Sequence, residues 1–175
     1  VKVYESTVDL VKQLKKNRFK TAIVSSSKNC RLVLKAADIE TLFDVRVDGV
    51  LSESLGLTGK PEPDIFLEAA KKLNADINRC VVVEDALSGV EAGKKGGFGM
   101  VIGVNRADQA KKLAEKGAHL VVDDLSEIEA GVDKETSWNL VYTNFDPEDE
   151  CHLLSLFPLS SFFFFSLSSL PLPLS

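Results

Sequence analysis

Apolar residues along this chain follow two spacings, one typical of helices and one typical of buried strands. Val8, Val11 and Leu14 recur at helical spacing. Cys80–Val83 is an apolar run without alternation, which is typical of a strand buried on both faces of a parallel sheet. Because such segments alternate over residues 1–128, the pattern predicts βα units and an α/β fold with a parallel sheet.

Local signals set the expected ends of these elements. Ser6 is expected to cap the first helix, with Asp9 three residues after it, and Pro63 suits the first turn of a later helix. Residues 48–59 are expected to form a loop. The other expected elements are strand Thr21–Val24, a helix through Leu32, Val33 and Ala36, strand Phe43–Val47, helix Pro63–Leu73, strand Cys80–Val83, a helix through Val90 and Ala92, strand Met100–Val104, helix Gln109–Lys116 and strand Leu120–Val122.

The last part of the chain, residues 151–175, is of a different kind. From Leu153 onward it contains Leu, Ser, Phe and Pro alone, with no charge. Pro158 and Pro171 leave too short an interval for the roughly twenty apolar residues of a membrane span. The segment has no helix or strand period, so we expect it to be disordered or prone to aggregation. These residue types all have codons made of pyrimidines, which suggests a translated non-coding stretch as one hypothesis.

Composition narrows the possible partners and the compartment. A net charge of −5 argues against a nucleic-acid partner or an anionic membrane surface. The three cysteines, Cys30, Cys80 and Cys151, are odd in number and lack CxxC spacing, which favours a reducing, cytoplasmic compartment over a disulfide framework or a zinc site. The chain opens on Val1 without an initiator Met, so an N-terminal part is expected to be missing and targeting cannot be read.

Three polar segments follow the ends of expected strands. The first is Ser25–Asn29, after Thr21–Val24, where hydroxyls, a helix start and the charge of Lys28 suit a bound phosphate. Helix capping is the alternative interpretation of these serines. The second is Lys60, held between glycine and proline as a positioned charge against an anion, with a solvated loop lysine as the alternative.

The third segment is Glu84-Asp85, at the end of Cys80–Val83. Open α/β sheets bind ligands at this edge, and two adjacent carboxylates there favour a cation. The alternative is that one acid caps the next helix. Hydroxyl donors, a lysine and a carboxylate pair in this order suit phosphoryl transfer, which needs anion donors, a cation and a metal around one phosphorus.

These motifs, VSSSKN, GKPEPDIF and VVVEDALSGVEAG, resemble the haloacid dehalogenase-like superfamily, and most closely its β-phosphoglucomutase-like branch, from about Val3 to Ile128. The resemblance implies a three-layer Rossmann-like parallel sheet over residues 1–128 and a phosphorylated sugar as substrate. Residues 129–150 would then be a linker or the start of a second domain.

The resemblance also implies roles for single residues. Ser25 would hold the transferring phosphate, with help from the Ser26 amide, and Lys60 would offset charge on the nucleophile and the phosphate. Ser27, Lys28 and Asn29 match positions that grip the second phosphate of a phosphomutase substrate. Glu84 and Asp85 would hold Mg²⁺. For Glu62 and Asp64, a loop partner and a helix cap are expected.

The chain also departs from the family pattern. A DxDG motif, which carries the nucleophilic aspartate, does not precede Ser25, and Asp9 alone lies upstream, inside the first helix. The helical cap domain is absent too. In this family the first strand lies between the strands that end in the second and fourth motifs, so we expect an incomplete sheet with a gap at its centre, poor solubility and no activity of the chain alone.

A weaker resemblance follows the core. Ser137–Tyr142 and Phe145–Glu148 are similar to the opening of maltose/trehalose/kojibiose phosphorylases, with an amphipathic linker as the alternative. It implies a fused glycoside phosphorylase that would make β-glucose 1-phosphate, the substrate of a β-phosphoglucomutase. Three functions therefore stay open: a phosphomutase, a sugar-phosphate phosphatase on the same core, and a non-catalytic module or gene-model fragment.

Overall fold

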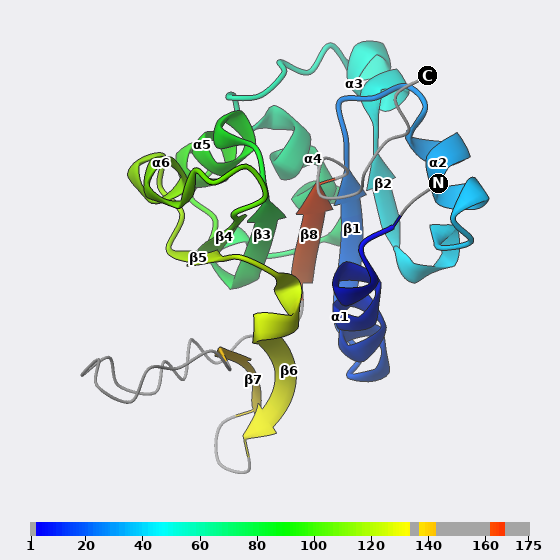
Figure 1. Cartoon of the computed structure of the whole chain (residues 1–175). Helices are drawn as coiled ribbons and strands as arrows, with labels where there is room; N and C mark the ends of the chain where they lie inside the picture. Colours follow the sequence, from blue (N-terminus) through cyan, green and yellow to red (C-terminus); the bar gives the residue numbers. More distant parts are fainter. Residues whose placement is uncertain (1–2, 134–136, 143–161, 167–175) are drawn as a thin grey trace.

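The computed structural model describes residues 3–133, 137–142 and 162–166, with side chains described for residues 3–130. A six-stranded sheet in the order β2-β1-β8-β3-β4-β5 forms the middle layer, and all its pairings are parallel (Figure 1). This confirms the expected parallel α/β fold. The strands are β1 (Lys20–Val24), β2 (Val45–Val47), β3 (Cys80–Glu84), β4 (Met100–Val104), β5 (Leu120–Val122) and β8 (Phe162–Ser166).

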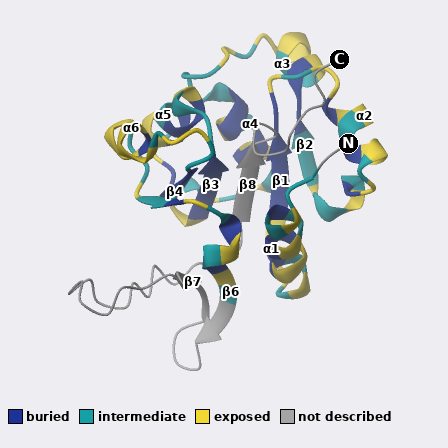
Figure 2. Ribbon diagram, in the orientation of Figure 1, coloured by how far each residue is buried: buried dark blue, intermediate teal, exposed yellow. Residues whose placement is uncertain are grey.

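Helices cover both faces of the sheet. Apolar side chains of α1 (Glu5–Lys16) and α2 (Cys30–Ala36) belong to one buried cluster, and those of α4 (Asp64–Leu73), α5 (Leu87–Lys95) and α6 (Ala110–Glu115) belong to another. Successive residues of a strand contribute to opposite clusters, as Val81 and Val82 do. Figure 2 shows the resulting buried strands between partly exposed helices. Short 3₁₀ turns lie between these elements at η1 (Glu40–Leu42), η2 (Ile77–Arg79) and η3 (Leu125–Glu127), and η3 buries Leu125.

Some of the expected local structure is confirmed and some is wrong. Strands β4 and β5 have the predicted ends. Residues 48–59, expected as a loop, contain helix α3 (Gly49–Leu55), whose N-cap Asp48 accepts a hydrogen bond from the Leu51 amide. Ser6 lies inside α1 and donates to Asp124, so the N-cap is Tyr4 instead. The second helix buries Cys30 and Leu34, whereas Leu32 is 67% exposed.

The centre of the sheet differs most from the sequence expectation. The gap expected between β1 and β3 is filled by β8, which pairs with both strands. Residues 162–166, expected to be disordered, therefore form a strand, because the gap offers them two sets of unpaired backbone groups. The remainder of the expected disordered tail lies outside the described residues.

A separate antiparallel hairpin follows the core. It consists of β6 (Ile128–Asp133) and β7 (Ser137–Tyr142), which point away from the main sheet (Figure 1). Residues 129–133 and 137–142 of the expected linker thus form strands, and residues 134–136 and 143–150 lie outside the described part. The hairpin is tied to α1 by a hydrogen bond from the Asn17 side chain to the Ala130 carbonyl. Within the described residues, the helices are all too short or too polar to cross a bilayer.

Candidate functional site

The candidate site surrounds the carboxyl end of β8. Val24 and Val83, near the ends of β1 and β3, lie in register with Ser166 and Phe165. The polar segments that follow β1 and β3 therefore face each other across one strand, at a separation of about 10 Å. The chain runs outward from β1 to β2 on one side and from β3 to β4 on the other, so this edge is a topological switch point.

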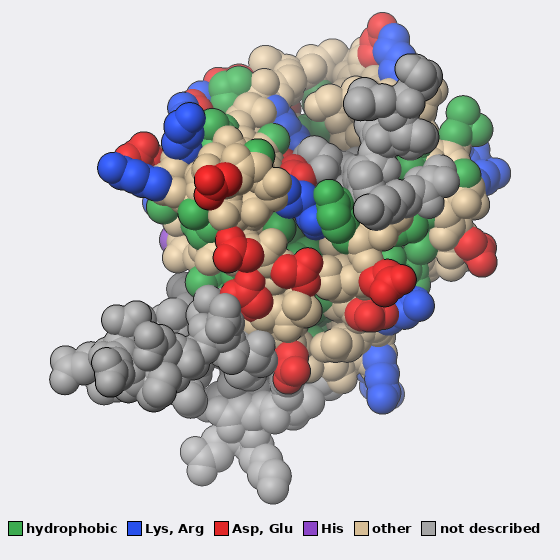
Figure 3. Space-filling model, viewed as in Figure 1, with side chains coloured by type: hydrophobic (Ala, Val, Ile, Leu, Met, Phe, Trp, Pro, Cys, Tyr) green, Lys and Arg blue, Asp and Glu red, His purple; other side chains and the backbone are tan. Residues whose placement is uncertain are grey.

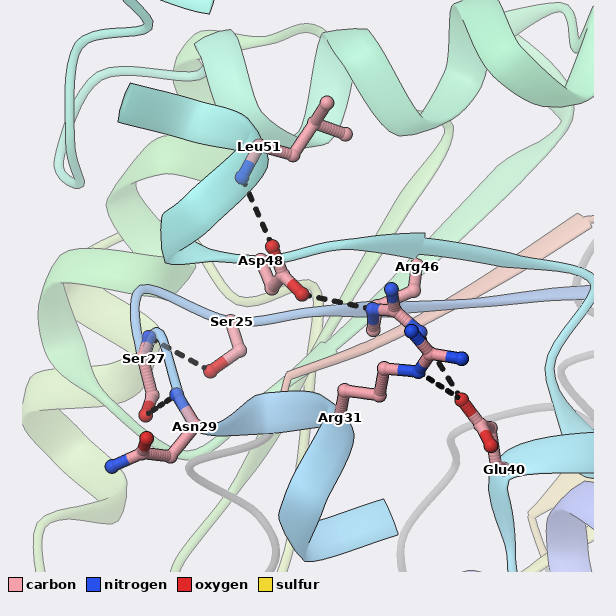
Figure 4. A network of polar contacts seen from close by, with 8 residues as sticks. All are labelled: Ser25, Ser27, Asn29, Arg31, Glu40, Arg46, Asp48 and Leu51. Carbon is pink, nitrogen blue, oxygen red and sulfur yellow. Dashed lines mark hydrogen bonds and ion pairs between the residues drawn. The ribbon is translucent and has the colours of Figure 1, made fainter. Parts of the chain in front are cut away.

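On the β1 side, the segment Ser25–Asn29 forms a tight turn before α2 (Figure 4). Ser25 is buried, and its hydroxyl accepts a hydrogen bond from the Ser27 amide at 3.1 Å. The Ser27 hydroxyl accepts in turn from the Asn29 amide at 3.1 Å. Asn29 is the N-cap of α2 without a side-chain cap bond, so helix capping does not account for the serines. Their hydroxyls stabilise the turn.

The end of β2 and the start of α3 hold this turn from behind. The Gly49 amide donates to the Ser27 carbonyl at 3.1 Å, and a side chain on Gly49 would collide with the Ser26 carbonyl. Asp48 is 6% exposed and binds the Arg46 guanidinium at 2.8 Å. Figure 4 shows this ion pair continuing to Glu40 and Arg31 beyond the turn. The Asp48-Gly49 pair is therefore part of the site's support.

The exposed residues of the turn project toward solvent. Ser26, Lys28 and Asn29 are exposed, and Ser27 is partly exposed. The Lys28 ammonium binds Glu53 of α3 at 2.8 Å, with both side chains more than half exposed. Such an exposed pair contributes little and is easily exchanged for another anion. Of the predicted phosphate-binding residues, Ser25–Asn29 thus lie together on one turn, with Ser25 as its buried member, whereas Lys60 lies on the β3 side.

On the β3 side, Lys60 binds Glu84. The Lys60 ammonium lies 2.6 Å from Glu84 Oε2, and the two side chains are 10% and 0% exposed. It also lies 5.1 Å from the centre of the Phe66 ring, in cation–π range. Lys60 is followed by a cis peptide bond to Pro61. The alternative of a solvated loop lysine is therefore wrong, because this ammonium is held in the core edge by a carboxylate.

The Glu84 carboxylate is held on its other side by the backbone. Its Oε1 accepts from the amides of Asp85 and Ala86 at 3.1 and 3.0 Å. A side chain on Gly89 would overlap the Glu84 carboxylate, so the helix after the motif must have glycine where it crosses this group. Glu84 therefore fixes Lys60, the turn after β3 and α5 in one arrangement.

Asp85 lies beside an arginine side chain that was not predicted from the sequence as part of the site. Arg106, just after β4, has its Nε 3.6 Å from Asp85 Oδ2, and its guanidinium stacks on the Tyr4 ring at 3.3 Å. The Gln109 side chain donates to the Asp85 carbonyl at 3.3 Å. The signal was present in the sequence, since Arg106 follows an apolar strand at the same edge as the other motifs.

Two acids outside these motifs have structural partners. The Glu62 carboxylate binds Lys95 at 2.8 Å, which agrees with the expected loop partner. Asp64 was expected to cap a helix, but Pro63 is the N-cap of α4 and Asp64 is the first helical residue. Its carboxylate accepts from the Thr58 amide at 3.0 Å and so closes the loop that carries Lys60.

The residues present do not make a complete magnesium site. Carboxylate oxygens are the ligands that Mg²⁺ prefers, and Glu84 and Asp85 supply two side chains of this type. Both oxygens of Glu84 are already bound, to Lys60 and to two amides. Over residues 3–130, His, Cys, Asp and Glu side chains nowhere gather in threes in a way that could hold a metal ion. The predicted Mg²⁺ therefore needs further ligands.

The cysteine nearest the site is not a nucleophile in this environment. Burial raises the pKa of the Cys30 thiol to about 12, and the nearby Asp48 carboxylate adds to the rise. Burial raises the pKa of the Cys80 thiol to about 12 as well. Both thiols are neutral at physiological pH and act as small apolar residues of the core.

Comparisons with known proteins show which family the chain belongs to. The family model of haloacid dehalogenase-like hydrolases matches residues 1–97. The chain belongs to this family. Within it, the chain falls in the β-phosphoglucomutase-like branch: a β-phosphoglucomutase of Mycobacterium bovis is 46% identical over 110 residues, which cover 61% of this chain and 42% of that protein.

Two further proteins are similar to this chain. A trehalose-phosphate phosphatase of Mycobacterium leprae is 38% identical over 128 residues, which cover 71% of this chain and 28% of that protein. The crystal structure of a β-phosphoglucomutase from Clostridium difficile superposes with a TM-score of 0.59 at 32% identity, over 69% of this chain and 50% of that one. The chain thus spans at most half the length of these relatives.

Proposed function

We propose that this chain is the core portion of a phosphoryl-transfer enzyme that converts β-glucose 1-phosphate to glucose 6-phosphate. The observation that carries the proposal is the Lys60–Glu84 ion pair, which brings the second and third polar segments together at the sheet edge that Ser25 occupies. Hydroxyl and amide donors on one side of a strand end and a buried ammonium on the other suit a phosphoryl group.

The residues have separate roles in this proposal. Ser25 and the Ser26 amide bind the transferring phosphoryl group, and Lys60 offsets its charge. Ser27, Lys28 and Asn29, which are at least partly exposed on the turn, bind the second phosphate of a sugar bisphosphate. Glu84 keeps the Lys60 ammonium in place, and Asp85 contributes one oxygen ligand to Mg²⁺, which when bound neutralises phosphate charge.

The reaction also needs a nucleophile that the sequence does not contain. A carboxylate nucleophile would form an aspartyl-phosphate, and the chain has no DxDG motif before Ser25. We therefore expect the chain alone to bind phosphate without turning over sugar phosphates. The test joins the chain to the reading frame upstream of Val1 and assays β-glucose 1-phosphate with a sugar bisphosphate activator; a product of glucose 6-phosphate supports the mutase.

A sugar-phosphate phosphatase is the second candidate. The name of the Mycobacterium leprae relative, a trehalose-phosphate phosphatase, favours it. Release of inorganic phosphate without glucose 6-phosphate in the same assay would identify this activity. A non-catalytic module is supported instead if the upstream frame encodes no DxDG strand, and the phosphate-binding test below then decides whether the turn still serves a ligand.

Phosphate binding can be measured on the chain itself. Gly49→Ala would push the Ser25–Asn29 turn through its collision with the Ser26 carbonyl, whereas Gly59 has no neighbouring atom within 4 Å. Inorganic phosphate is expected to raise the melting temperature of the unmodified chain and of Gly59→Ala, but not of Gly49→Ala. An equal rise in all three proteins would count against this turn as the phosphate site.

A fused glycoside phosphorylase is a further part of the proposal. The similar segment Ser137–Tyr142 corresponds to β7, and Phe145–Glu148 lies outside the described residues. Such a partner would supply β-glucose 1-phosphate to this core. A reading frame that continues into a phosphorylase domain downstream of these segments would support the fusion.

A further inference from the structure

The strand at the centre of the sheet comes from the last part of the chain. β8 lies between β1 and β3, parallel to both (Figure 1). Its residues 162–166 pair in register with Lys20–Val24 on one side, and residues 162–165 pair with Cys80–Val83 on the other. β8 therefore joins the two halves of the sheet through backbone pairing on both of its sides.

The two strands that flank β8 form a slot for one strand. Without an occupant, β1 and β3 would each have an unpaired backbone edge in the middle of the sheet, where water cannot satisfy it. Ile23, Val24, Val81, Val82 and Val83 are all 0% exposed in the occupied state. The slot therefore favours a strand that is apolar throughout, because both faces of this sheet are covered by helices.

The composition of the tail explains why residues 162–166 enter the slot. A central strand must donate backbone N–H groups on both sides, so it cannot contain proline. Pro158 and Pro171 restrict a central strand to the interval between them, and Phe162–Phe165 is the uninterrupted apolar run in that interval. Phe is also favoured in strands. Residues 143–161 connect β7 to β8 and can span up to about 60 Å, so the chain can reach its own slot.

We propose that β1 and β3 form a strand-docking slot and that residues 162–166 of the same chain fill it as an exchangeable plug. Because β8 is parallel to β1 and β3, its carboxyl end at Ser166 lies between the Ser25–Asn29 turn and Glu84. A second consequence rests on the proposed function: a nucleophile-bearing strand needs this same slot, so β8 and that strand exclude each other. While β8 is docked, the phosphate site therefore lacks its nucleophile.

Amide hydrogen exchange of the full chain tests the docking directly. In the unmodified protein, residues 162–166 are expected to exchange at least about 100-fold more slowly than an unstructured peptide, as β1 and β3 do. Light scattering on the same sample is expected to show a monomer. Exchange of residues 162–166 at the unstructured rate would overturn the proposal, and so would a dimer, because a second copy would then supply the strand.

A proline substitution tests the exchangeable character. Phe164→Pro removes a donor in the middle of β8, whereas Leu170→Pro places the same residue outside it. The Phe164→Pro protein is expected to lose exchange protection in β1 and β3 about 10-fold or more while β4 and β5 keep theirs. Unchanged protection in β1 and β3 would refute the plug, and so would loss of protection throughout the chain, because β8 would then be a fixed part of the core.

None of these readouts uses enzymatic activity. Failure of the exchange test therefore leaves the proposed phosphoryl transfer standing. Failure of the sugar-phosphate assay likewise leaves the docking of β8 standing, without its consequence for the nucleophile.

Discussion

Removing the charge of Lys60 should expose how strongly the site depends on one ion pair. Lys60→Met keeps the length of the side chain and removes its ammonium, which lies 2.6 Å from Glu84. Glu84 is 0% exposed, so its carboxylate would remain buried at the edge of the core without that cation. Loss of one partner of a buried ion pair typically costs about 3–5 kcal/mol of unfolding free energy.

The structure places the expected loss at the lower end of that range. Glu84 Oε1 keeps its hydrogen bonds to the amides of Asp85 and Ala86. Lys60 is 10% exposed, so water can partly replace its ammonium. We therefore expect Lys60→Met to lower the unfolding free energy by about 3 kcal/mol. Adding Glu84→Gln removes the unpaired charge and keeps an oxygen for the two amides, so the double variant should recover about 2 kcal/mol.

Equilibrium unfolding in urea measures these differences. The control is Lys111→Met, because the Lys111–Glu115 pair is 91% and 63% exposed and should change the free energy by less than about 0.5 kcal/mol. A Lys60→Met protein as stable as this control would refute the reasoning. So would a double variant that is less stable than Lys60→Met, because the coupling between the two side chains would then have the wrong sign.

Three further predictions concern the same core. Gly89→Ala should lower the unfolding free energy by about 2 kcal/mol, because the added methyl group overlaps the buried Glu84 carboxylate. Urea unfolding measures this loss, with Gly59→Ala as the control, because a methyl group on Gly59 meets no atom within 4 Å. Equal stability of the two variants would contradict the prediction. In binding titrations with inorganic phosphate, Ser25→Ala should weaken affinity roughly 10-fold through loss of one hydroxyl donor, whereas Ser54→Ala on α3 should match the unmodified chain. Burial and nearby Lys94 lower the pKa of His119 below its usual 6.5, and its Nδ1 accepts the Val101 amide. The contribution of His119 to stability is therefore full above pH 6.5 and is lost as the pH falls through the lowered pKa. The melting temperature of the unmodified protein should accordingly fall more between pH 7.5 and 5.5 than that of the non-titrating His119→Asn protein. Identical pH profiles of the two proteins would contradict this.

The sheet was predictable from sequence wherever a strand is an apolar run with polar flanks. β3, β4 and β5 are of this kind, and each was expected within one residue of its observed ends. Helix α3 was not predictable in this way. Its apolar residues Val50 and Leu55 are 53% and 49% exposed, so they form no buried stripe that periodicity could reveal.

The residues of the site likewise divide into those that the sequence predicts and those that depend on the folded core. Lys60, Glu84 and Ser25 were expected from motifs that lie at strand ends, and the ion pair between the first two fits that expectation. The roles of Gly49 and Gly89 depend on which backbone or carboxylate passes nearby, which is a property of the folded core. β8 is the extreme case, because its place is decided by a gap between two strands far away in the sequence.

The position of β8 also determines when the protein can fold. A ribosome makes β1 before β3, and it makes the strand that joins them only after β4, β5, β6 and β7. The two halves of the sheet must therefore wait, each with an open edge, until residues 162–166 have emerged. Pairing between such distant segments is slow, because loop closure must come before any contact energy is gained. Nascent chains should accordingly depend on chaperones until β8 has emerged.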